Sequence, residues 1–294
     1  MESLSSGAAL RRAAEEECLQ VPGAPNALSA KLIERYGFEA MYLSGAAFSA
    51  GDLALPDVGL FTLTELVEQA KRLTAAANIP LIVDADTGFG DVVNVERTVF
   101  ELESAGAAAI QLEDQQLPKR CGHLSGKTLV DSQAMCAKIR AAANARGDDD
   151  LVIIARTDAR GVNGIDDALR RAASYVEAGA DWIFPEALRT EEEFAQFANQ
   201  IGVPLMANMT EFGKSPLLDL QVLQSIGYAA VLYPVTLLRV AMRAMEAALA
   251  MLSGDGHQRE LLDLMQTRED LYDLLEYEEY EQRDREYFGH DGTV

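Results

Sequence analysis

Cysteines, basic side chains and long apolar runs are all scarce in this chain of 294 residues. Three cysteines are too few for a disulfide framework, which indicates a reducing compartment. The 25 basic residues stand against 47 acidic ones, and the resulting net charge of −22 argues against binding to nucleic acid or to anionic membranes, because both rely on Lys and Arg. The longest apolar run, residues 229–238, contains Pro234 and is shorter than the roughly 20 residues that span a bilayer.

Two recognisable signals are also missing. Residues 1–10 lack the basic segment followed by a long apolar one that marks a secretory signal, so we expect a soluble, cytoplasmic protein. The chain has no G-x-G-x-x-G motif, and residues 122–128 lack the first glycine of a P-loop because position 121 is cysteine. A nucleotide-binding, doubly wound sheet is therefore disfavoured.

Short apolar runs alternate with amphipathic segments along the chain. Most runs are continuous, as in parallel strands that are covered on both faces, and several of the helical segments end at glycine. This order predicts an α/β fold, a (β/α)8 TIM-type barrel with additional C-terminal helices. We expect strands at residues 18–21, 40–43, 80–84, 108–113, 151–156, 181–185, 204–207 and 229–233, and helices at residues 63–76, 93–105, 131–145, 165–178, 190–200 and 215–226.

The character of the chain changes after residues 252–256. We expect the barrel domain over residues 1–255 and an acidic helical extension over residues 256–294. The extension carries Tyr272, Tyr277, Tyr280 and Tyr287. It either packs its aromatic face on the barrel or is exchanged with a neighbouring subunit, and the sequence does not decide between the two.

In a barrel, functional side chains collect at the carboxyl ends of the strands. Asp84 and Asp86 follow the third expected strand two residues apart, so both point to the same side of an extended chain. Such a pair repels itself unless a cation intervenes, and oxygen ligands of this kind suit Mg2+, although Asp is also common at turns and helix caps. Further strands end in polar residues that suit an anionic ligand: Glu113, Asp114, Arg156, Thr157, Asp158, Glu186, Asn208, Thr210 and Glu211.

A long connection, residues 114–130, follows the fourth expected strand. Connections of this length with internal glycines often act as lids. Cys121 lies in it beside two cations and near a histidine, where a thiol can exchange a proton at neutral pH. A buried structural role suits Cys18 and Cys136 but fits Cys121 badly, because its neighbours are charged.

Residues 119–123, Lys-Arg-Cys-Gly-His, resemble the signature of the isocitrate lyase and phosphoenolpyruvate mutase superfamily. Further segments that match the superfamily lie in the family's order at residues 84–90 and 111–114, before this signature, and at residues 155–158 and 184–187, after it. The resemblance extends from about residue 44 to residue 268. It implies a Mg2+-dependent carbon–carbon lyase, with Mn2+ as a substitute metal. The branch resembled most cleaves 2-methylisocitrate to pyruvate and succinate in propionate catabolism by the methylcitrate cycle, and members of the resembling families form homotetramers.

The resemblance also implies a role for each residue of the site. Asp84, Asp86, Asp57 and Glu113 would hold the metal, directly or through water. Cys121 would protonate the departing carbanion, Tyr42 would remove the hydroxyl proton unless it is only a core-facing aromatic, and Arg156 would clamp a carboxylate and the oxygen at the breaking bond. The substrate would be bound by Ser44, Gly45, Ala46, Gly122, His123, Arg156, Glu186, Asn208, Thr210, Arg239 and Arg268, with Ala46 keeping its backbone N–H where the family often has glycine.

Related activities stay open at this point. Phe184 and Leu232 match the methyl-pocket positions of the resembling branch. Isocitrate lyases usually have a longer chain and a lysine at the position of Arg120, so the resemblance favours the methyl substrate. A 2,3-dimethylmalate lyase and an enzyme that cleaves isocitrate or oxaloacetate share the motifs, and one methyl group changes binding by only about 1–3 kcal/mol. A non-catalytic barrel with an acidic tail for assembly is the alternative of a different class.

Overall fold

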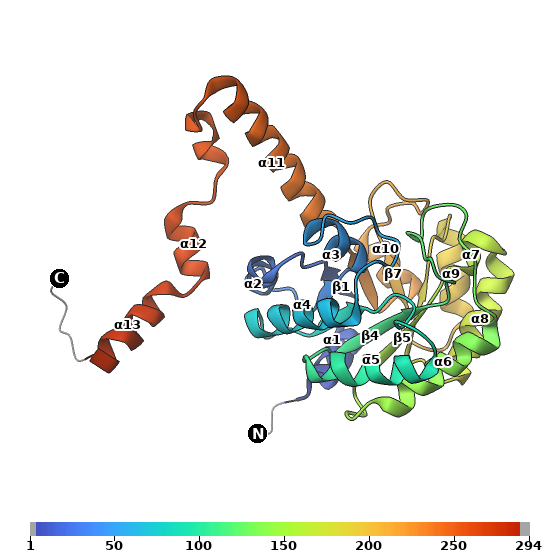
Figure 1. Cartoon of the computed structure of the whole chain (residues 1–294). Coiled ribbons are helices and arrows are strands. Elements are labelled where there is room, and N and C mark those ends of the chain that lie inside the picture. The colour runs from blue at the N-terminus through green and yellow to red at the C-terminus, as the bar shows by residue number, and fades with distance from the viewer. Residues whose placement is uncertain (1–3, 289–294) are drawn as a thin grey trace. The chain divides into compact units, whose positions relative to one another are not determined.

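The computed structural model describes residues 4–288 (Figure 1). The chain divides into two compact units, Met1–Arg239 and Val240–Val294, and each is described here by itself. Among the described helices, none combines the length and the apolar character that a membrane crossing requires.

Parallel strands form the centre of the first unit, and helices surround them in Figure 1. Three strands pair in the order β1-β8-β7 and five in the order β2-β3-β4-β5-β6. Single parallel bridges, Gly23 to Tyr42 and Ile183 to Leu205, connect the two sheets and bring the order round to a ring. The predicted (β/α)8 arrangement is thereby confirmed. Its strands are β1 (Leu19–Pro22), β2 (Met41–Leu43), β3 (Leu81–Asp84), β4 (Ala109–Glu113), β5 (Val152–Thr157), β6 (Trp182–Pro185), β7 (Met206–Asn208) and β8 (Ala230–Tyr233).

The six predicted helices are all present, and one of them differs clearly in its bounds. Helices at residues 6–16, 27–35, 45–51 and 159–162 were not predicted. The helix expected from residue 215 begins at Leu220, because Pro216 disfavours helical geometry before it and Asp219 adopts an extended backbone as the N-cap. The helices are α1 (Ser6–Glu16), α2 (Ala27–Arg35), α3 (Gly45–Gly51), α4 (Leu63–Ala76), α5 (Val92–Ser104), α6 (Ser132–Ala145), α7 (Ala159–Val162), α8 (Ile165–Glu177), α9 (Glu191–Gln200) and α10 (Leu220–Ile226).

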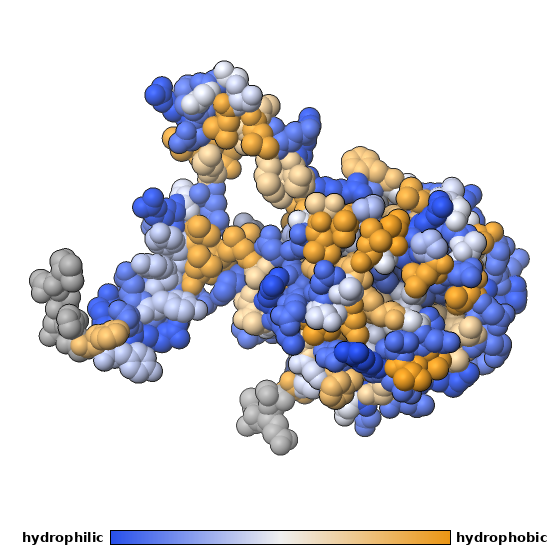
Figure 2. All heavy atoms as spheres, viewed as in Figure 1, coloured by the Kyte–Doolittle hydropathy of each residue, from blue (hydrophilic) through white to orange (hydrophobic). Residues whose placement is uncertain are grey.

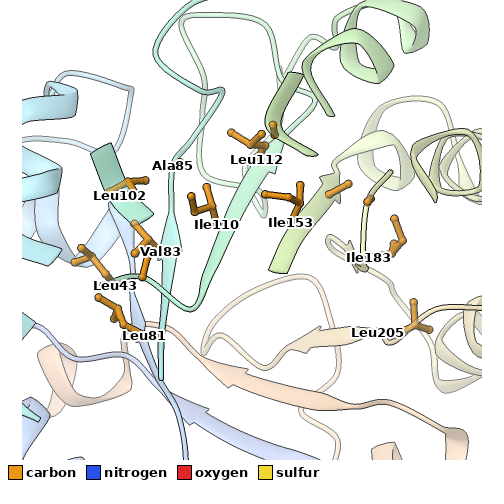
Figure 3. Close-up of a cluster of buried hydrophobic side chains, with 14 of the residues drawn as sticks. Leu43, Leu81, Val83, Ala85, Leu102, Ile110, Leu112, Ile153, Ile183 and Leu205 are labelled. Carbon is orange, nitrogen blue, oxygen red and sulfur yellow. The ribbon is translucent and has the colours of Figure 1, made fainter. Parts of the chain in front are cut away.

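The strands carry two cores because side chains alternate between their two faces. Figure 3 shows the outer core, in which Val83, Ile110 and Ile153 lie between the strands and the surrounding helices. The inner core fills the ring with Ile82, Val152, Ile154, Trp182 and their neighbours, and Leu10 and Ala13 of α1 pack against it. A filled ring leaves the carboxyl ends of the strands as the place for a site.

The same alternation sets which residues reach that end of the ring. Tyr42, Phe184 and Leu232 belong to the inner core. Continuing each strand by two residues along the inner face leads to polar side chains instead of apolar ones. These inward positions are held by Ser44, Asp84, Asp86, Gln111, Glu113, Arg156, Asp158, Glu186 and Asn208, all of them buried.

The second unit is helical. Its elements are the end of α11 (Thr236–Asp255), the 3-10 turn η1 (Arg259–Leu264), α12 (Arg268–Leu274) and α13 (Tyr277–Phe288). No residue of α11 is buried, although the helix is largely apolar, and Figure 2 shows hydrophobic residues at the surface of the helices after the barrel. The predicted domain boundary at residue 255 coincides with the end of α11. The boundary between the two compact units lies instead within α11, between Arg239 and Val240. The boundary and the packing of the extension stay predictions.

Candidate active site

A pocket of about 80 Å3 lies at the carboxyl ends of the strands. Strand ends, the segment after β2 and the loop of residues 114–130, called here the lid loop, all contribute to its wall. Most of the predicted site residues line it: Tyr42, Ser44, Ala46, Asp57, Asp84, Cys121, Gly122, His123, Arg156, Glu186, Asn208, Thr210 and Arg239. The structure therefore brings together residues that are almost 200 positions apart in the chain.

Three further predicted residues lie directly behind the pocket wall. Gly45 donates its backbone N–H to Asp84 Oδ2 over 3.1 Å, and the N–H of Asp86 lies 3.2 Å from Asp84 Oδ1. Glu113 Oε2 lies 3.2 Å from Arg156 Nη1. Arg268 begins α12 in the second unit, so its role in binding stays a prediction.

Carboxylates at the end of β3 form the acidic side of the pocket. Asp84 and Asp86 are 6% and 4% exposed, and the Lys119 ammonium contacts both Asp57 and, at 2.7 Å, Asp86 Oδ1. Burial raises the pKa of Asp86 to about 7, an effect that the charge of Lys119 opposes and that of Asp84 strengthens. These acids need positive charge close by, and Lys119 provides part of it.

The donor set fits Mg2+. It offers only oxygen atoms, and Mg2+ takes one or two carboxylates and keeps waters as its other ligands. Among the residues that the structure describes, no three His, Cys, Asp or Glu side chains converge as a complete set of ligands. Glu113 Oε1 is buried and has no hydrogen-bond partner within residues 4–288, which suits an acceptor for a water held by the metal.

Arg156, at the end of β5, is the central cation of the pocket. Its guanidinium binds Asp158 through Nε at 3.0 Å and through Nη2 at 3.2 Å. It also lies 3.2 Å from Glu113 and 3.4 Å from Glu186, and its Cζ lies 5.4 Å from the centre of the Phe184 ring. Held on several sides, this guanidinium presents a fixed positive charge to an anionic ligand.

The lid loop lies closed over this cation. His123 Nδ1 accepts the backbone N–H of Lys214 at 2.8 Å, so its proton is on Nε2, which lies 2.7 Å from Glu186 Oε1. Burial alone would raise the pKa of Glu186, but the charge of Arg156 and the hydrogen bond from His123 lower it below its usual value. The Cys121 thiol lines the pocket beside this bonded pair.

Tyr42 reaches the pocket from β2 with its hydroxyl engaged. The hydroxyl donates to Gln111 Oε1, and Gln111 Nε2 donates to Asp84 Oδ1 at 3.1 Å. Burial, and next the negative charge of Asp84, raise the pKa of Tyr42 well above its usual value, while Arg156 opposes this shift. A phenol in this state needs additional cations before it can act as a base, so that role of Tyr42 stays a prediction.

Four buried residues of the site were not assigned to catalysis, to substrate binding or to the metal from the sequence. Gln111 and Asp158 were within reach of it, because both occupy inward positions at the ends of strands. Lys119 stands inside the signature of residues 119–123, although nothing in the sequence pairs it with Asp57 or Asp86. Lys127 gave no signal, because a lysine in a loop ordinarily points into solvent.

Comparison with known proteins gives a consistent result for nearly the whole chain. Residues 9–253 match the family model described as phosphoenolpyruvate phosphomutase. A 2-methylisocitrate lyase of Aeropyrum pernix is 52% identical, with 95% of this chain and 90% of the relative covered. A 2-methylisocitrate lyase of Bacillus subtilis is 50% identical, with 92% of this chain and 88% of the relative covered.

Solved structures extend the likeness to the fold. A crystal structure of 2,3-dimethylmalate lyase superposes with a TM-score of 0.91 at 34% identity, with 99% of both chains covered. Phosphonopyruvate hydrolase, solved with oxalate and Mg2+, superposes with a TM-score of 0.87 at 32% identity, covering 97% of this chain and all of the other. Both superpositions extend over the barrel and the helices that follow it.

The close approach of Gly122 to the pocket wall generates a first prediction. A Cβ at this position would lie 2.4 Å from Arg156 Nη2 and 2.5 Å from Glu186 Cγ, and Arg156 is held by several partners. We expect Gly122→Ala to push the lid loop open and to raise tryptic cleavage after Arg120 about tenfold or more, because overpacking of this kind costs about 1–3 kcal/mol.

Gly202→Ala is the matched control, because a Cβ there meets no atom within 4 Å. Cleavage should be followed by mass spectrometry at a fixed ratio of trypsin to protein. An unchanged cleavage rate in Gly122→Ala would show that the lid loop does not depend on this contact.

Proposed function

Because the chain belongs to the phosphoenolpyruvate phosphomutase family, within the isocitrate lyase and phosphoenolpyruvate mutase superfamily, we propose that it is a Mg2+-dependent carbon–carbon lyase that cleaves 2-methylisocitrate to pyruvate and succinate. The observation that carries this proposal is that one pocket is lined by the acids Asp57 and Asp84, by Arg156 and by Cys121. The relatives named 2-methylisocitrate lyase support the choice of substrate. The free thiols of all three cysteines fit work in the reducing cytoplasm.

Asp84 and Asp86 are the residues that would hold Mg2+, with Asp57 and Glu113 accepting hydrogen bonds from its waters. When bound, the ion would act as a Lewis acid toward the oxygen of the oxo-acid product and would help to hold that product. Mn2+ suits the same oxygen ligands and is proposed as a substitute. The Mg2+ that accompanies oxalate in phosphonopyruvate hydrolase, a protein of the same fold, supports this assignment.

The reaction breaks the bond between the carbon that bears the hydroxyl and the carbon next to it. The hydroxyl gives its proton to Tyr42, the proposed base, which would act here as a phenolate. The hydroxyl oxygen becomes the keto oxygen of pyruvate, and the electrons of the broken bond move to a carbon beside a carboxylate. Arg156 stabilises the charge on the oxygen, because its guanidinium is already fixed before substrate arrives. Cys121 then gives its thiol proton to the carbanion, which completes succinate. The closed lid loop keeps bulk water away from this carbanion.

The remaining pocket residues define the two ends of the substrate. Ser44 and the backbone around Ala46 lie near the acids and would bind the pyruvate end. His123, Glu186, Asn208, Thr210 and Arg239 would bind the succinate end, with Arg268 as a further proposed ligand. Phe184 and Leu232 supply apolar wall for the extra methyl group. Cleavage of 2,3-dimethylmalate, isocitrate or oxaloacetate is the alternative, supported by the likeness to 2,3-dimethylmalate lyase.

We also propose a homotetramer built from dimers that exchange α11. This helix carries Met242, Met245, Leu249 and Leu252 at the three- and four-residue spacing of a packed seam, and each of them is more than 40% exposed. An apolar groove of about 380 Å3 opens on the outer side of β1 and β8. It is lined by Gln20, Pro22, Leu32, Ile33, Tyr36, Phe38, Tyr233, Thr236 and Leu237. Exposed apolar side chains of this kind are ordinarily buried in an interface. In the proposed dimer, α11 of each copy packs its apolar side chains on the other copy.

A comparison of substrates tests the proposed activity. With Mg2+, we expect 2-methylisocitrate to be cleaved at least about tenfold more efficiently than isocitrate, because its methyl group fills the apolar wall. Excess EDTA should abolish turnover, and Asp84→Ala should lose turnover and its metal dependence together. Equal turnover with and without EDTA would overturn the metal assignment, and preference for 2,3-dimethylmalate would move the substrate to the alternative.

Replacement of the thiol tests the proton donor. We expect Cys121→Ser to lower kcat by about 100-fold or more, since a hydroxyl gives up its proton far less readily than a thiol. Binding of Mg2+ and pyruvate, measured by calorimetry, should stay nearly unchanged. Cys136→Ala removes a buried thiol from α6 and serves as the control. A kcat near that of the unmodified enzyme would remove Cys121 from this role.

Charges placed on the seam test the assembly. The double variant Met245→Glu with Leu249→Glu, and separately Tyr36→Glu in the groove, should each lower the mass in sedimentation equilibrium from tetramer toward monomer. Ala247→Glu adds the same charge on the opposite side of α11 and should leave the mass unchanged. An unchanged mass in both seam and groove variants would contradict the exchange.

A further inference from the structure

Lys127 is a buried lysine that the proposed reaction does not use. Its side chain is 2% exposed, and lysine is rarely buried unless it is paired. The ammonium lies 2.5 Å from Asp158 Oδ1 and donates a second hydrogen bond to the carbonyl oxygen of Gly122. One cation thus connects a strand end of the barrel to the lid loop.

The two partners of Lys127 belong to parts of the structure that are held very differently. Residues 128–130, directly after Lys127, are bound to the start of the loop: Gln116 N–H donates to Thr128 O at 2.8 Å, and Val130 N–H donates to Asp114 O at 3.0 Å. Gly122 lies between Cys121 and His123, in the part that covers the pocket. Lys127 therefore belongs to the end of the lid loop that is fixed by backbone hydrogen bonds, and it donates a hydrogen bond to the part of the loop that covers the pocket.

Asp158 carries the connection onward to the reacting groups. The carboxylate that binds Lys127 also accepts both hydrogen bonds from Arg156. Its own position is fixed from behind, since its backbone N–H donates to Asp114 Oδ1 at 2.9 Å. Gly122, at the other end of the connection, packs directly against Arg156 and Glu186.

We propose that Lys127 is a positioning residue that couples closure of the lid loop to Arg156, by bridging the Gly122 carbonyl and the Asp158 carboxylate. The inference rests on the proposed function, because it gives closure a part in catalysis. Lys127 touches neither the pocket nor the reacting atoms, and acts through the residues beside it.

The chemistry of the bridge explains why a lysine serves here. Gly122 is buried when the loop is closed, so its carbonyl oxygen loses contact with water and needs a donor from the protein. An ammonium offers three N–H donors, enough for the carbonyl and the carboxylate together. In an open loop, water would solvate the Gly122 carbonyl, and Lys127 would retain its ion pair with Asp158 but lose its hydrogen bond to Gly122. The bridge therefore stabilises the closed loop, in which Cys121 and Arg156 face the same space.

Lys127→Met tests the bridge, because it keeps the length of the side chain and removes the ammonium, while Asp158 retains Arg156. We expect kcat/KM for 2-methylisocitrate to fall about 10- to 100-fold, the effect of losing a charged hydrogen bond. The second measurement is alkylation of Cys121 by iodoacetamide, followed by mass spectrometry, with and without Mg2+, pyruvate and succinate. Cys18 and Cys136 are buried, which makes Cys121 the accessible thiol. The ligands should slow alkylation strongly in the unmodified enzyme and only weakly in Lys127→Met.

Lys71→Met is the control, since Lys71 is exposed on α4 and pairs only with Glu68 at 3.5 Å among the described residues. It should leave both measurements unchanged. Lys127→Arg keeps charge and donors and should retain most of the protection of Cys121. Should Lys127→Met not fold, Lys127→Gln, which keeps an N–H donor without the charge, decides the same comparison.

The two proposals fail in different ways. Absence of ligand protection in the unmodified enzyme would count against the proposed function. Full protection in Lys127→Met, or in Lys127→Gln where that variant is used, would overturn the bridge even if the melting temperature falls, because a purely structural lysine would change stability without changing closure.

Discussion

The site depends on the burial of many carboxylates in one small volume. Asp84, Asp86, Glu113, Asp158 and Glu186 are all 6% exposed or less, and the last three contact a single guanidinium, that of Arg156. Charges removed from water are costly unless opposite charges compensate them nearby. Among the strand-end residues of this pocket, Arg156 is the cation that compensates the buried carboxylates. The other cations that lie close to these carboxylates come from the lid loop.

The lid loop meets this demand with its own side chains. Lys119 reaches Asp57 and Asp86, Lys127 reaches Asp158, and His123 donates to Glu186. Three of these contacts, those to Asp86, Asp158 and Glu186, join the loop to the ends of β3, β5 and β6, so the closed loop supplies compensating charge. Cys121 lies among these three contacts and is carried with them. In this closed arrangement Cys121 lines the pocket while the surrounding acids have their partners.

This constraint also explains what the sequence could and could not predict. The order of strands and helices follows from periodicity, and the inward position of Asp84 and Arg156 follows from alternation along a strand. Cys121 was found from its charged neighbours in a long loop, and the role of His123 came from the resemblance to a signature. The partners of Lys119 and Lys127 were not found, because they depend on how a long loop folds over distant strand ends. The start of α10 was predicted too early because the periodic pattern continues through Pro216, whereas the helix begins after its N-cap, Asp219.

Division of labour between strands and loop is consistent with the range of reactions named among similar proteins. The acids and Arg156 lie at or directly after the ends of short, fully buried strands, whose positions the two cores fix. Phosphonopyruvate hydrolase, a protein of the same fold, was solved with oxalate and Mg2+. Under the proposed function the leaving group would meet residues 121–123, whose backbone is held by a few side-chain contacts rather than by a sheet. Changes of substrate within this fold should therefore begin in the loop and in the apolar wall of Phe184 and Leu232, while the acids and Arg156 stay as they are.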